Sequence, residues 1–261
     1  MPVAVLSGLT QNHLTPAPNA LHLLILNLMP NRAVTERQFT RLFEAIGRPV
    51  ALTFCLPATH RLRHDAAALL AAYRTFAQVR AQHFDGLIIT GAPLDRMPFD
   101  AVDFWPELRE LMTWRRTHVT GSVFICWGAD AAGALEGTFT GERLTTKING
   151  VYTTDGLTMP QSRYFRIPPA AVRRGRILAS GPGLGVTALA DDATHSLYLA
   201  GHLEYLTGTL RAEFYRDLTR DAQTRPPAHY LDTDLQPHNH WAQDAVRVYT
   251  TWLNSLTEAL S

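Results

Sequence analysis

The sequence has little cysteine, no long apolar segment and almost no net charge. Two cysteines among 261 residues, Cys55 and Cys126, are typical of a reducing compartment, where a thiol is usually free. No apolar stretch approaches the roughly 20 residues that cross a bilayer, and residues 1–10 lack the features of a secretory signal. The formal net charge of +1 gives no electrostatic attraction to nucleic acid or to a membrane surface. We therefore expect a cytoplasmic protein without nucleic-acid or membrane partners.

The composition is that of a folded globular chain. Hydrophobic residues make up 46% of the sequence and charged residues 18%, which allows a sizeable core and argues against long disorder. The length fits one large domain. We predict a single domain over residues 1–261, with residues 1–20 as an N-terminal extension and residues 224–241, rich in Pro, His and Asp, as a long loop.

Short apolar runs alternate with helical patterns along the chain. Strands are predicted at residues 21–28, 50–56, 84–91 and 119–126, with antiparallel additions at 176–189 and 195–201. Helices are predicted at residues 65–82, 107–116, 127–135, 209–221 and 242–260. Thr35 and Gln38 match a capping box that would start a further helix. The alternation is typical of an α/β fold, in which helices flank a mostly parallel central sheet on both faces and sites form at the carboxyl ends of the strands.

Cys126 ends one of these apolar strands and directly precedes a predicted helix. A thiol at this point projects from the carboxyl edge of the sheet, and the helix N-terminus favours the nucleophilic thiolate. The arrangement has the strand–turn–helix form of a nucleophile elbow. A buried structural thiol is the alternative, because free cysteine is among the most buried residue types.

His202 and Glu204 follow another predicted strand. On an extended segment residues i and i+2 face the same way, so the imidazole could accept the Cys126 proton while Glu204 orients it. An ordinary surface histidine beside a surface glutamate would give the same pattern, and His-x-Glu alone is a weak signal. The three residues together favour a catalytic triad.

Several longer stretches occur in the order found in one enzyme family. They are Leu26-Asn-Leu-Met-Pro30, Thr35-Glu36, Gln38-Phe39, Phe84-Asp-Gly-Leu-Ile-Ile-Thr-Gly-Ala-Pro-Leu94, Val102, Trp105-Pro106, His118-Val-Thr120, Cys126-Trp127, Lys147, Gly150-Val-Tyr152, Ser162-Arg-Tyr164, Gly201-His202, Glu204-Tyr205, Glu213-Phe214, Arg216-Asp217 and Trp252-Leu-Asn254. On these stretches the sequence resembles the homoserine O-acyltransferases of the succinyltransferase type. The resemblance covers nearly the whole chain from residue 21. It implies a fold like that of class I glutamine amidotransferases, with flavodoxin-like layers.

The resemblance also implies a role for each matched residue. Cys126 would take the acyl group from a coenzyme A thioester, with His202 as base and Glu204 as its orienting partner. The other implied roles are an oxyanion hole from the backbone N–H groups of Leu94 and Trp127, substrate contacts by Lys147, Ser162 and Arg216, and a looser coenzyme A contact by Arg32. Arg216 would grip the amino-acid carboxylate. Without the resemblance, Lys147 and Arg216 would pass for solvated charges.

The mechanism implied is ping-pong transfer from acyl-CoA to the side-chain hydroxyl of homoserine. Acyl-CoA is then a cosubstrate, and neither a bound cofactor nor a metal is expected. Asp95 follows Leu94 where the family carries a carboxylate with acetyl-CoA and a glycine with succinyl-CoA, so acetyl is favoured over succinyl. If Asp95 points elsewhere, a succinyl pocket stays open. Homodimers are common in the family, which leaves a homodimer open here.

Some positions depart from the family pattern. Leu203 replaces the proline of the usual Gly-His-Pro-Glu, the segment between Tyr152 and Ser162 is short, and the loop at residues 227–232 near the pocket differs. Serine is one methylene shorter than homoserine, and one methylene gives discrimination of only about 1–3 kcal/mol. L-serine or a related hydroxy amino acid is therefore the alternative acceptor.

Two other functions are compatible with the same residues. A glutamine amidotransferase-like hydrolase would share the triad, although Phe124 stands where its elbow usually has glycine. A non-catalytic, metabolite-binding member of the fold is the second rival. Cys55 is predicted to be a core residue, and His238 with His240 lacks the rest of a metal-ligand set.

Overall fold

The computed structural model describes residues 3–61 and 66–258. Its strands are β1 (Val3–Ser7), β2 (Leu21–Leu26), β3 (Val50–Leu56), β4 (Arg74–Thr75), β5 (Phe84–Ile89), β6 (Val119–Ile125), β7 (Glu142–Thr154), β8 (Leu157–Arg166), β9 (Arg176–Gly181), β10 (Gly185–Asp191) and β11 (Ser196–Leu199). Its α-helices are α1 (Arg32–Ile46), α2 (Ala66–Ala72), α3 (Phe76–Val79), α4 (Trp105–His118), α5 (Trp127–Glu136), α6 (Thr209–Leu218) and α7 (Ala242–Glu258). Within these described ranges, no helix is long and apolar enough to cross a membrane.

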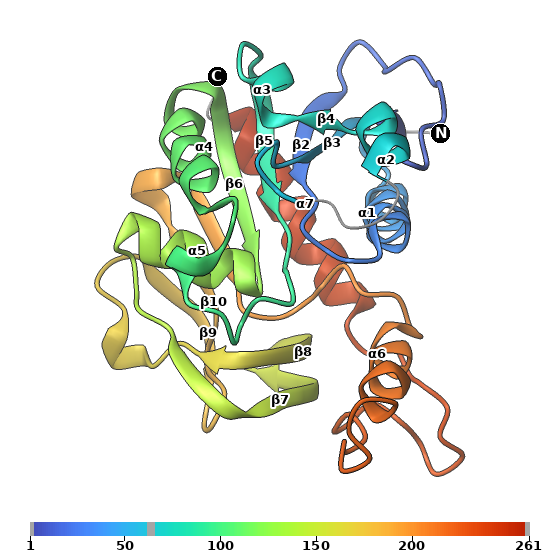
Figure 1. Ribbon diagram of the computed structural model, residues 1–261, viewed down its shortest axis with the longest axis vertical. Helices are drawn as coiled ribbons and strands as arrows, with labels where there is room; N and C mark the ends of the chain where they lie inside the picture. The colour runs from blue at the N-terminus through green and yellow to red at the C-terminus, as the bar shows by residue number, and fades with distance from the viewer. Residues whose placement is uncertain (1–2, 62–65, 259–261) are drawn as a thin grey trace.

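A nine-stranded sheet runs through the middle of the described structure (Figure 1). Its strands follow the order β1-β3-β2-β5-β6-β11-β10-β9, with β4 beside β3. Pairing is parallel from β1 to β11 and antiparallel at β10 and β9. The inner strands β2, β5 and β6 are apolar and mostly buried, as expected for parallel strands that are covered on both faces. The predicted α/β fold with a mostly parallel central sheet is confirmed.

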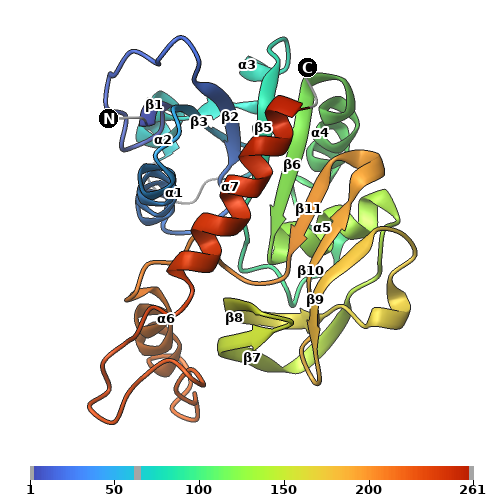
Figure 2. The same ribbon diagram turned by 180° about the vertical axis from the view of Figure 1, so that it is seen from behind.

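Helices cover both faces of the sheet (Figures 1 and 2). Helices α4 and α5 contact β6 on one face, and α7 crosses β5 and β6 on the other, beside α1. Two glycines allow α7 to approach the sheet closely. A Cβ added at Gly86 would lie 2.7 Å from the Trp252 ring, and one at Gly121 would lie 2.7 Å from Leu256. Small residues on these strands therefore make room for the large side chains of α7.

The sheet order brings three chain segments together at one edge. Strands β5, β6 and β11 are neighbours, with Ile89 opposite Phe124 and Leu199 opposite Ile125. All three run parallel, so the residues that follow them leave the sheet at the same carboxyl edge. These are the segments that contain Gly91, Cys126 and His202.

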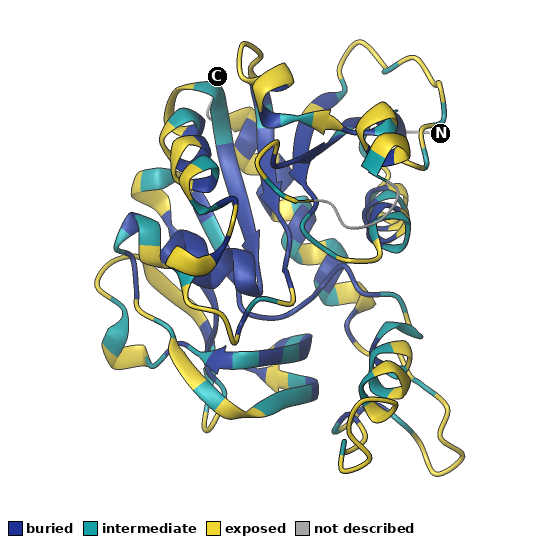
Figure 3. Ribbon diagram, in the orientation of Figure 1, coloured by how far each residue is buried: buried dark blue, intermediate teal, exposed yellow. Residues whose placement is uncertain are grey.

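A second layer lies below this edge and is less buried (Figure 3). It consists of the β7–β8 hairpin and of α6 with the loop that follows it. The predicted loop at residues 224–241 is tied to the hairpin, because the Val151 N–H donates to the Ala228 carbonyl at 2.8 Å and the Ala228 N–H donates to the Asn149 carbonyl at 3.1 Å. The hairpin and α6 thus face the edge where Cys126 lies.

Two predictions about helices are wrong. The capping box at Thr35 does not form, because α1 begins at Arg32 with Asn31 as its N-cap, and the Asn31 side chain accepts from the Val34 N–H at 3.4 Å. The single helix at 65–82 is also wrong: its first residue lies outside the described ranges, and α2, β4 and α3 occupy the rest. Tyr73 follows the end of α2, and its hydroxyl donates to the buried Glu36 carboxylate.

Other differences concern elements that the sequence pattern did not indicate. Strand β1 lies in the predicted N-terminal extension and pairs with β3 at the sheet edge. The β7–β8 hairpin was not predicted, and the strand at 176–189 is divided by a turn into β9 and β10. The strand predicted at 195–201 is present as β11, but it extends the sheet parallel to β6 and is antiparallel only to β10, so its prediction as an antiparallel addition is wrong. The end of the helix predicted at 242–260 falls outside the described residues, and the other predicted helices and strands are confirmed to within a few residues.

Candidate active site

Cys126 lies in the sharp turn between β6 and α5. Its backbone has φ 51° and ψ −119°, a conformation rarely adopted by a residue with a side chain and one that costs on the order of 1–3 kcal/mol. Hydrogen bonds hold it there: its N–H donates to the Leu199 carbonyl at 2.7 Å, and its carbonyl accepts from the N–H groups of Ala129 and Asp130 at 2.9 and 3.1 Å. This strained strand-to-helix turn has the geometry of a nucleophile elbow.

His202 and Glu204 form a buried pair beside the thiol. The imidazole Nδ1 lies 2.7 Å from Glu204 Oε1, and both side chains are almost fully buried. The sequence argument assumed that the segment after the strand is extended, which is wrong, because β11 ends at Leu199 and the chain turns at Leu203 and Glu204. The His202 N–H is fixed by the Pro160 carbonyl at 2.8 Å. The turn therefore brings the pair together by a different backbone path.

Gly91 provides the space in which thiol and imidazole meet. A Cβ added there would lie 3.0 Å from His202 Cε1 and 3.2 Å from Cys126 Cβ. Both side chains therefore border the small volume above this glycine. A side chain at position 91 would force one of them to move.

The pKa values of Cys126 and His202 depend on their burial and on the charges around them. Burial raises the pKa of the Cys126 thiol, which the cationic form of His202 lowers and the nearby Asp95 raises again. Burial alone would lower the pKa of His202, but the negative charges of Glu204 and of the Cys126 thiolate raise it well above its ordinary value. The imidazole is thus a stronger base than free histidine and is suited to take the thiol proton.

A buried guanidinium contributes positive charge to this region. Arg163 has no solvent exposure, and its donors meet only neutral acceptors, namely Gln161 Oε1 at 2.8 Å, the Leu184 carbonyl at 3.0 Å and the Phe165 carbonyl. Burial lowers its pKa to about 10, against the charges of Cys126 and Asp95. At neutral pH it remains a cation near the nucleophile.

Asp95 is buried next to the nucleophile. One carboxylate oxygen accepts from the Tyr164 N–H at 2.8 Å, while Oδ1 is buried and has no hydrogen-bond partner among the described residues. Burial raises the pKa of this carboxyl.

Ser162 and Tyr205 are joined by one carboxylate on α6. The Ser162 hydroxyl donates to Glu213 Oε2 at 2.6 Å, and the Tyr205 hydroxyl donates to Glu213 Oε1 at 2.7 Å. Tyr205 stacks on the His202 ring with centroids 4.1 Å apart, and the Ser162 carbonyl lies 3.9 Å from Cys126 Sγ. Sequence reasoning assigned no role to Glu213 or Tyr205, whose only signal was their place in the family stretches.

Lys147 and Arg216 converge on a single aspartate. Lys147 Nζ lies 2.8 Å from Asp217 Oδ2, and Arg216 donates from Nε and Nη2 to Asp217 Oδ1 at 2.9 and 2.8 Å. Burial acts to raise the pKa of Asp217, but its contacts with the two cations outweigh burial and lower the pKa. The two predicted substrate-binding cations therefore do lie together, at the partly exposed rim of the site.

The remaining predicted residues are placed less directly. Trp127 is the first residue of α5, so its N–H is among the amides that have no partner within the helix. The Leu94 N–H donates to the Ala92 carbonyl at 2.8 Å. Arg32 begins α1; its interactions described by the structure are with Asn27 and Tyr73, and not with the triad.

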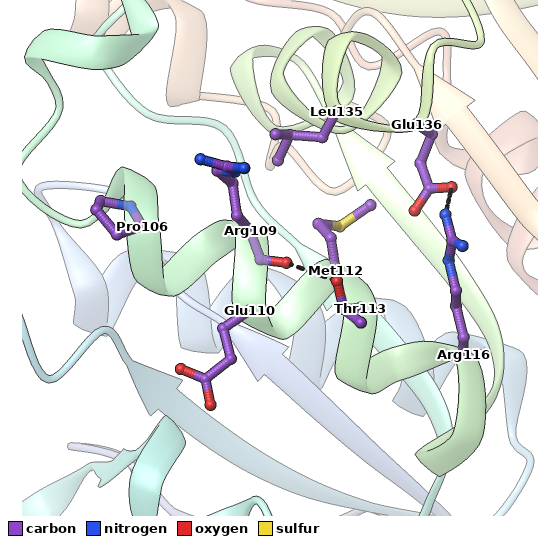
Figure 4. Close-up of a pocket in the computed structure, with 8 residues that line it drawn as sticks. All are labelled: Pro106, Arg109, Glu110, Met112, Thr113, Arg116, Leu135 and Glu136. Carbon is purple, nitrogen blue, oxygen red and sulfur yellow. Dashed lines mark hydrogen bonds and ion pairs between the residues drawn. The ribbon is translucent and has the colours of Figure 1, made fainter.

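A cavity of about 400 Å³ lies between α4 and the far end of α5, away from Cys126 (Figure 4). Its lining residues are Pro106, Arg109, Glu110, Met112, Thr113, Arg116, Leu135 and Glu136. Arg116 is paired with the buried Glu136 at 2.8 Å. None of the predicted site residues lines it. We place the candidate site at Cys126, because a thiol, an imidazole and a carboxylate meet there.

Metal-ligating side chains are scattered elsewhere in the described ranges. Over residues 3–61 and 66–258, no group of three or more His, Cys, Asp or Glu is arranged to hold a metal ion. His238 pairs with Asp232 at 2.9 Å in the exposed loop. Cys55 is fully buried in the core, as predicted.

Comparisons with known proteins identify the family and the fold of the chain. A model of the homoserine O-succinyltransferase family matches residues 11–259. A homoserine O-acetyltransferase of Leuconostoc mesenteroides is 39% identical to this chain, over 92% of this chain and 83% of its own length. The homoserine O-acetyltransferase of Lactococcus lactis is 33% identical over 90% of this chain and 79% of its own length. That of Streptococcus pneumoniae is 34% identical over 90% of this chain and 81% of its own length. A glutamine amidotransferase structure from Thermotoga maritima has a TM-score of 0.57 at 14% identity, covering 91% of this chain and 96% of that one, which shows a shared fold.

Proposed function

The chain belongs to the homoserine O-succinyltransferase family, and from that premise we propose that it transfers an acyl group from acyl-CoA to the side-chain hydroxyl of homoserine through an acyl-enzyme on Cys126. The strained elbow at Cys126 beside the buried His202–Glu204 pair is the observation that carries the proposal. A thiol next to a base that a carboxylate orients is the arrangement required for nucleophilic acyl transfer.

The first half-reaction loads the enzyme. His202 takes the Cys126 proton, and the sulfur forms a bond to the thioester carbonyl carbon. The N–H groups of Trp127 and Leu94 are proposed to stabilise the oxyanion, for which the Leu94 N–H must leave the Ala92 carbonyl. The carbon–sulfur bond to coenzyme A then breaks, and the departing thiolate takes the proton from His202. Arg32, at the start of α1, is proposed to contact the coenzyme A moiety.

The second half-reaction passes the acyl group on. His202 removes the proton of the acceptor hydroxyl, whose oxygen attacks the acyl carbon. The bond to Cys126 breaks, and the thiolate recovers its proton from the imidazolium. Arg216 and Lys147 are proposed to hold the acceptor's α-carboxylate, with Ser162 contacting the substrate nearby. Their position at the partly exposed rim fits an acceptor that enters after coenzyme A has left.

Acetyl is the proposed acyl group. The relatives named above are homoserine O-acetyltransferases, and Asp95 is buried beside the nucleophile with one oxygen unpaired. A succinyl group would bring its distal carboxylate toward that oxygen. Two like charges buried close together are strongly unfavourable.

Changing Asp95 should change the choice of donor. We expect Asp95→Gly to shift the ratio of kcat/KM values toward succinyl-CoA by at least about tenfold, which corresponds to about 1.4 kcal/mol. Asp95→Asn keeps the volume and removes the charge, so it separates repulsion from steric exclusion. Steady-state kinetics with both donors measure the ratio. An unchanged ratio in both variants would contradict the role of Asp95.

The acceptor is best tested by crossing donors with hydroxy amino acids. We expect the highest kcat/KM for the pair acetyl-CoA and homoserine, with O-acetylhomoserine identified by mass spectrometry. L-Serine is the alternative acceptor, and a lead of serine over homoserine would reassign the substrate. Release of ammonia from glutamine would favour the hydrolase, and failure of both donors to acylate the protein would favour a non-catalytic binding protein.

A further inference from the structure

Asp217 is shared between two cations from separate elements. Lys147 lies in β7, at the irregular stretch between Arg143 and Ile148 where the register with β8 shifts. Arg216 belongs to α6, which projects beside the hairpin in two opposite views (Figures 1 and 2). Each oxygen of Asp217 serves one cation, at 2.8 Å from Lys147 Nζ and at 2.8–2.9 Å from the Arg216 guanidinium. The carboxylate is thus a bridge between the hairpin and α6.

Without this bridge the two cations would separate. Like charges that converge on one small ligand repel each other before the ligand arrives. Lysine carries its charge on a flexible stem and loses much rotamer freedom when it is held. The Arg216 side chain is 43% exposed, so burial alone does not fix it.

We propose that Asp217 is a positioning residue, a shared counter-ion that holds Lys147 and Arg216 together to receive the acceptor's α-carboxylate. The inference rests on the proposed function, in which those two cations bind the acceptor. Lys147, Arg216 and Asp217 together carry a net charge of +1, which attracts a carboxylate, and the Glu213 carboxylate also acts on Arg216. Asp217 acts through the two cations, and it touches no reacting atom.

This role predicts a specific pattern of kinetic loss. In Asp217→Asn the KM for homoserine should rise about tenfold, because the cations are no longer held together, while kcat stays within about threefold. The rate at which acetyl-CoA acylates Cys126 should not change. Homoserinol, in which a hydroxymethyl group replaces the α-carboxylate, should bind the wild type and the variant with equal apparent affinity, measured as KM or as competitive inhibition.

Control variants separate positioning from a general structural effect. Asp217→Glu keeps the charge and should recover part of the affinity for homoserine. Asp221→Asn removes a charge just beyond α6 from an exposed aspartate whose carboxylate accepts from the nearby Gln223 N–H, and because its backbone hydrogen bonds to Asp217 and Thr224 are kept, it should leave all parameters unchanged. Thermal unfolding of each variant confirms that it is folded.

Three outcomes would overturn the inference while leaving the proposed function intact. The first is an unchanged KM for homoserine in Asp217→Asn. The second is a lowered KM, which would make Asp217 a competitor of the substrate carboxylate. The third is an equal loss for homoserine and homoserinol, which would mark a merely structural residue. A wild-type enzyme that transfers no acyl group would instead contradict the proposed function itself.

Discussion

Replacing Cys126 with alanine is expected to lower kcat/KM for acyl transfer at least about 10⁴-fold, because the covalent intermediate can no longer form. Alanine is a suitable replacement at this position. It keeps a small side chain at φ 51°, so the elbow and its hydrogen bonds to Leu199, Ala129 and Asp130 can persist. The effect should therefore report the lost sulfur and not a collapsed turn.

The second cysteine provides the matched control. Cys55 lies in β3, is fully buried, and burial raises its pKa strongly, so it remains a neutral thiol. Intact-protein mass spectrometry after exposure to acetyl-CoA should show one acetyl group on the wild type and on Cys55→Ala, and none on Cys126→Ala. Transfer activity that survived in Cys126→Ala would exclude the acyl-enzyme, whatever the product.

The position of Cys126 could be predicted because it depends on local sequence. The apolar run Val123-Phe-Ile125 leads into the cysteine, and the alanine-rich segment from Trp127 to Leu135 follows it. Strand and helix patterns of this kind are set by periodicity, which a single sequence displays. The carboxyl edge of a parallel sheet then indicates where a site will form. The local sequence thus predicts the elbow, although not its partners.

The partners depend on contacts between distant segments, which periodicity does not contain. Asp217 meets Lys147 across 70 positions, and Ser162 meets Glu213 across 51. The residues of α6 carry the helical pattern of an exposed element, and nothing in that pattern distinguishes a carboxylate that binds a partner from one in solvent. The role of Gly91 is equally hidden, since it arises from the absence of a Cβ between two side chains from distant segments, Cys126 and His202.

The wrong helix predictions have a related cause. Residues 65–82 are rich in alanine and favour a helix locally. In the fold, Tyr73 and Asn27 form hydrogen bonds around the buried Glu36, and the Leu9 and Thr10 N–H groups also donate to that carboxylate, at 3.0 and 2.7 Å. A buried carboxylate is tolerated only when such donors surround it. These contacts of Tyr73 come from distant segments of the chain, and local helix propensity does not contain them.

Glu204→Gln is expected to lower the rate of Cys126 acylation by about 10²- to 10⁴-fold, since the imidazolium formed during thiol deprotonation loses its counter-charge. The substitution keeps the shape of the side chain and an oxygen that can accept from His202 Nδ1. It removes the charge of a carboxylate whose second oxygen is buried without a partner. The loss should therefore be electrostatic and appear in the chemical step.

The pH dependence gives a sign that distinguishes this effect from misfolding. Burial lowers the pKa of His202, and the charge of Glu204 is the largest influence that raises it. Removing that charge lets burial dominate, so the pKa of His202 falls. His202 must be neutral to accept the thiol proton. In the pH profile of the acylation rate, the acid limb should therefore move to lower pH, while the maximal rate at the plateau falls. Stopped-flow acylation across pH measures both.

A matched control variant tests whether the effect of Glu204→Gln is specific to the charge beside His202. Glu44→Gln removes a glutamate charge from the exposed face of α1 and should change neither the plateau nor the limb. If the acid limb of Glu204→Gln stayed in place and the plateau fell less than about threefold, Glu204 would be a structural neighbour of His202. A shift to lower pH together with a large loss of rate would instead establish that the enzyme uses the buried carboxylate to make His202 basic and to stabilise the cation that His202 becomes.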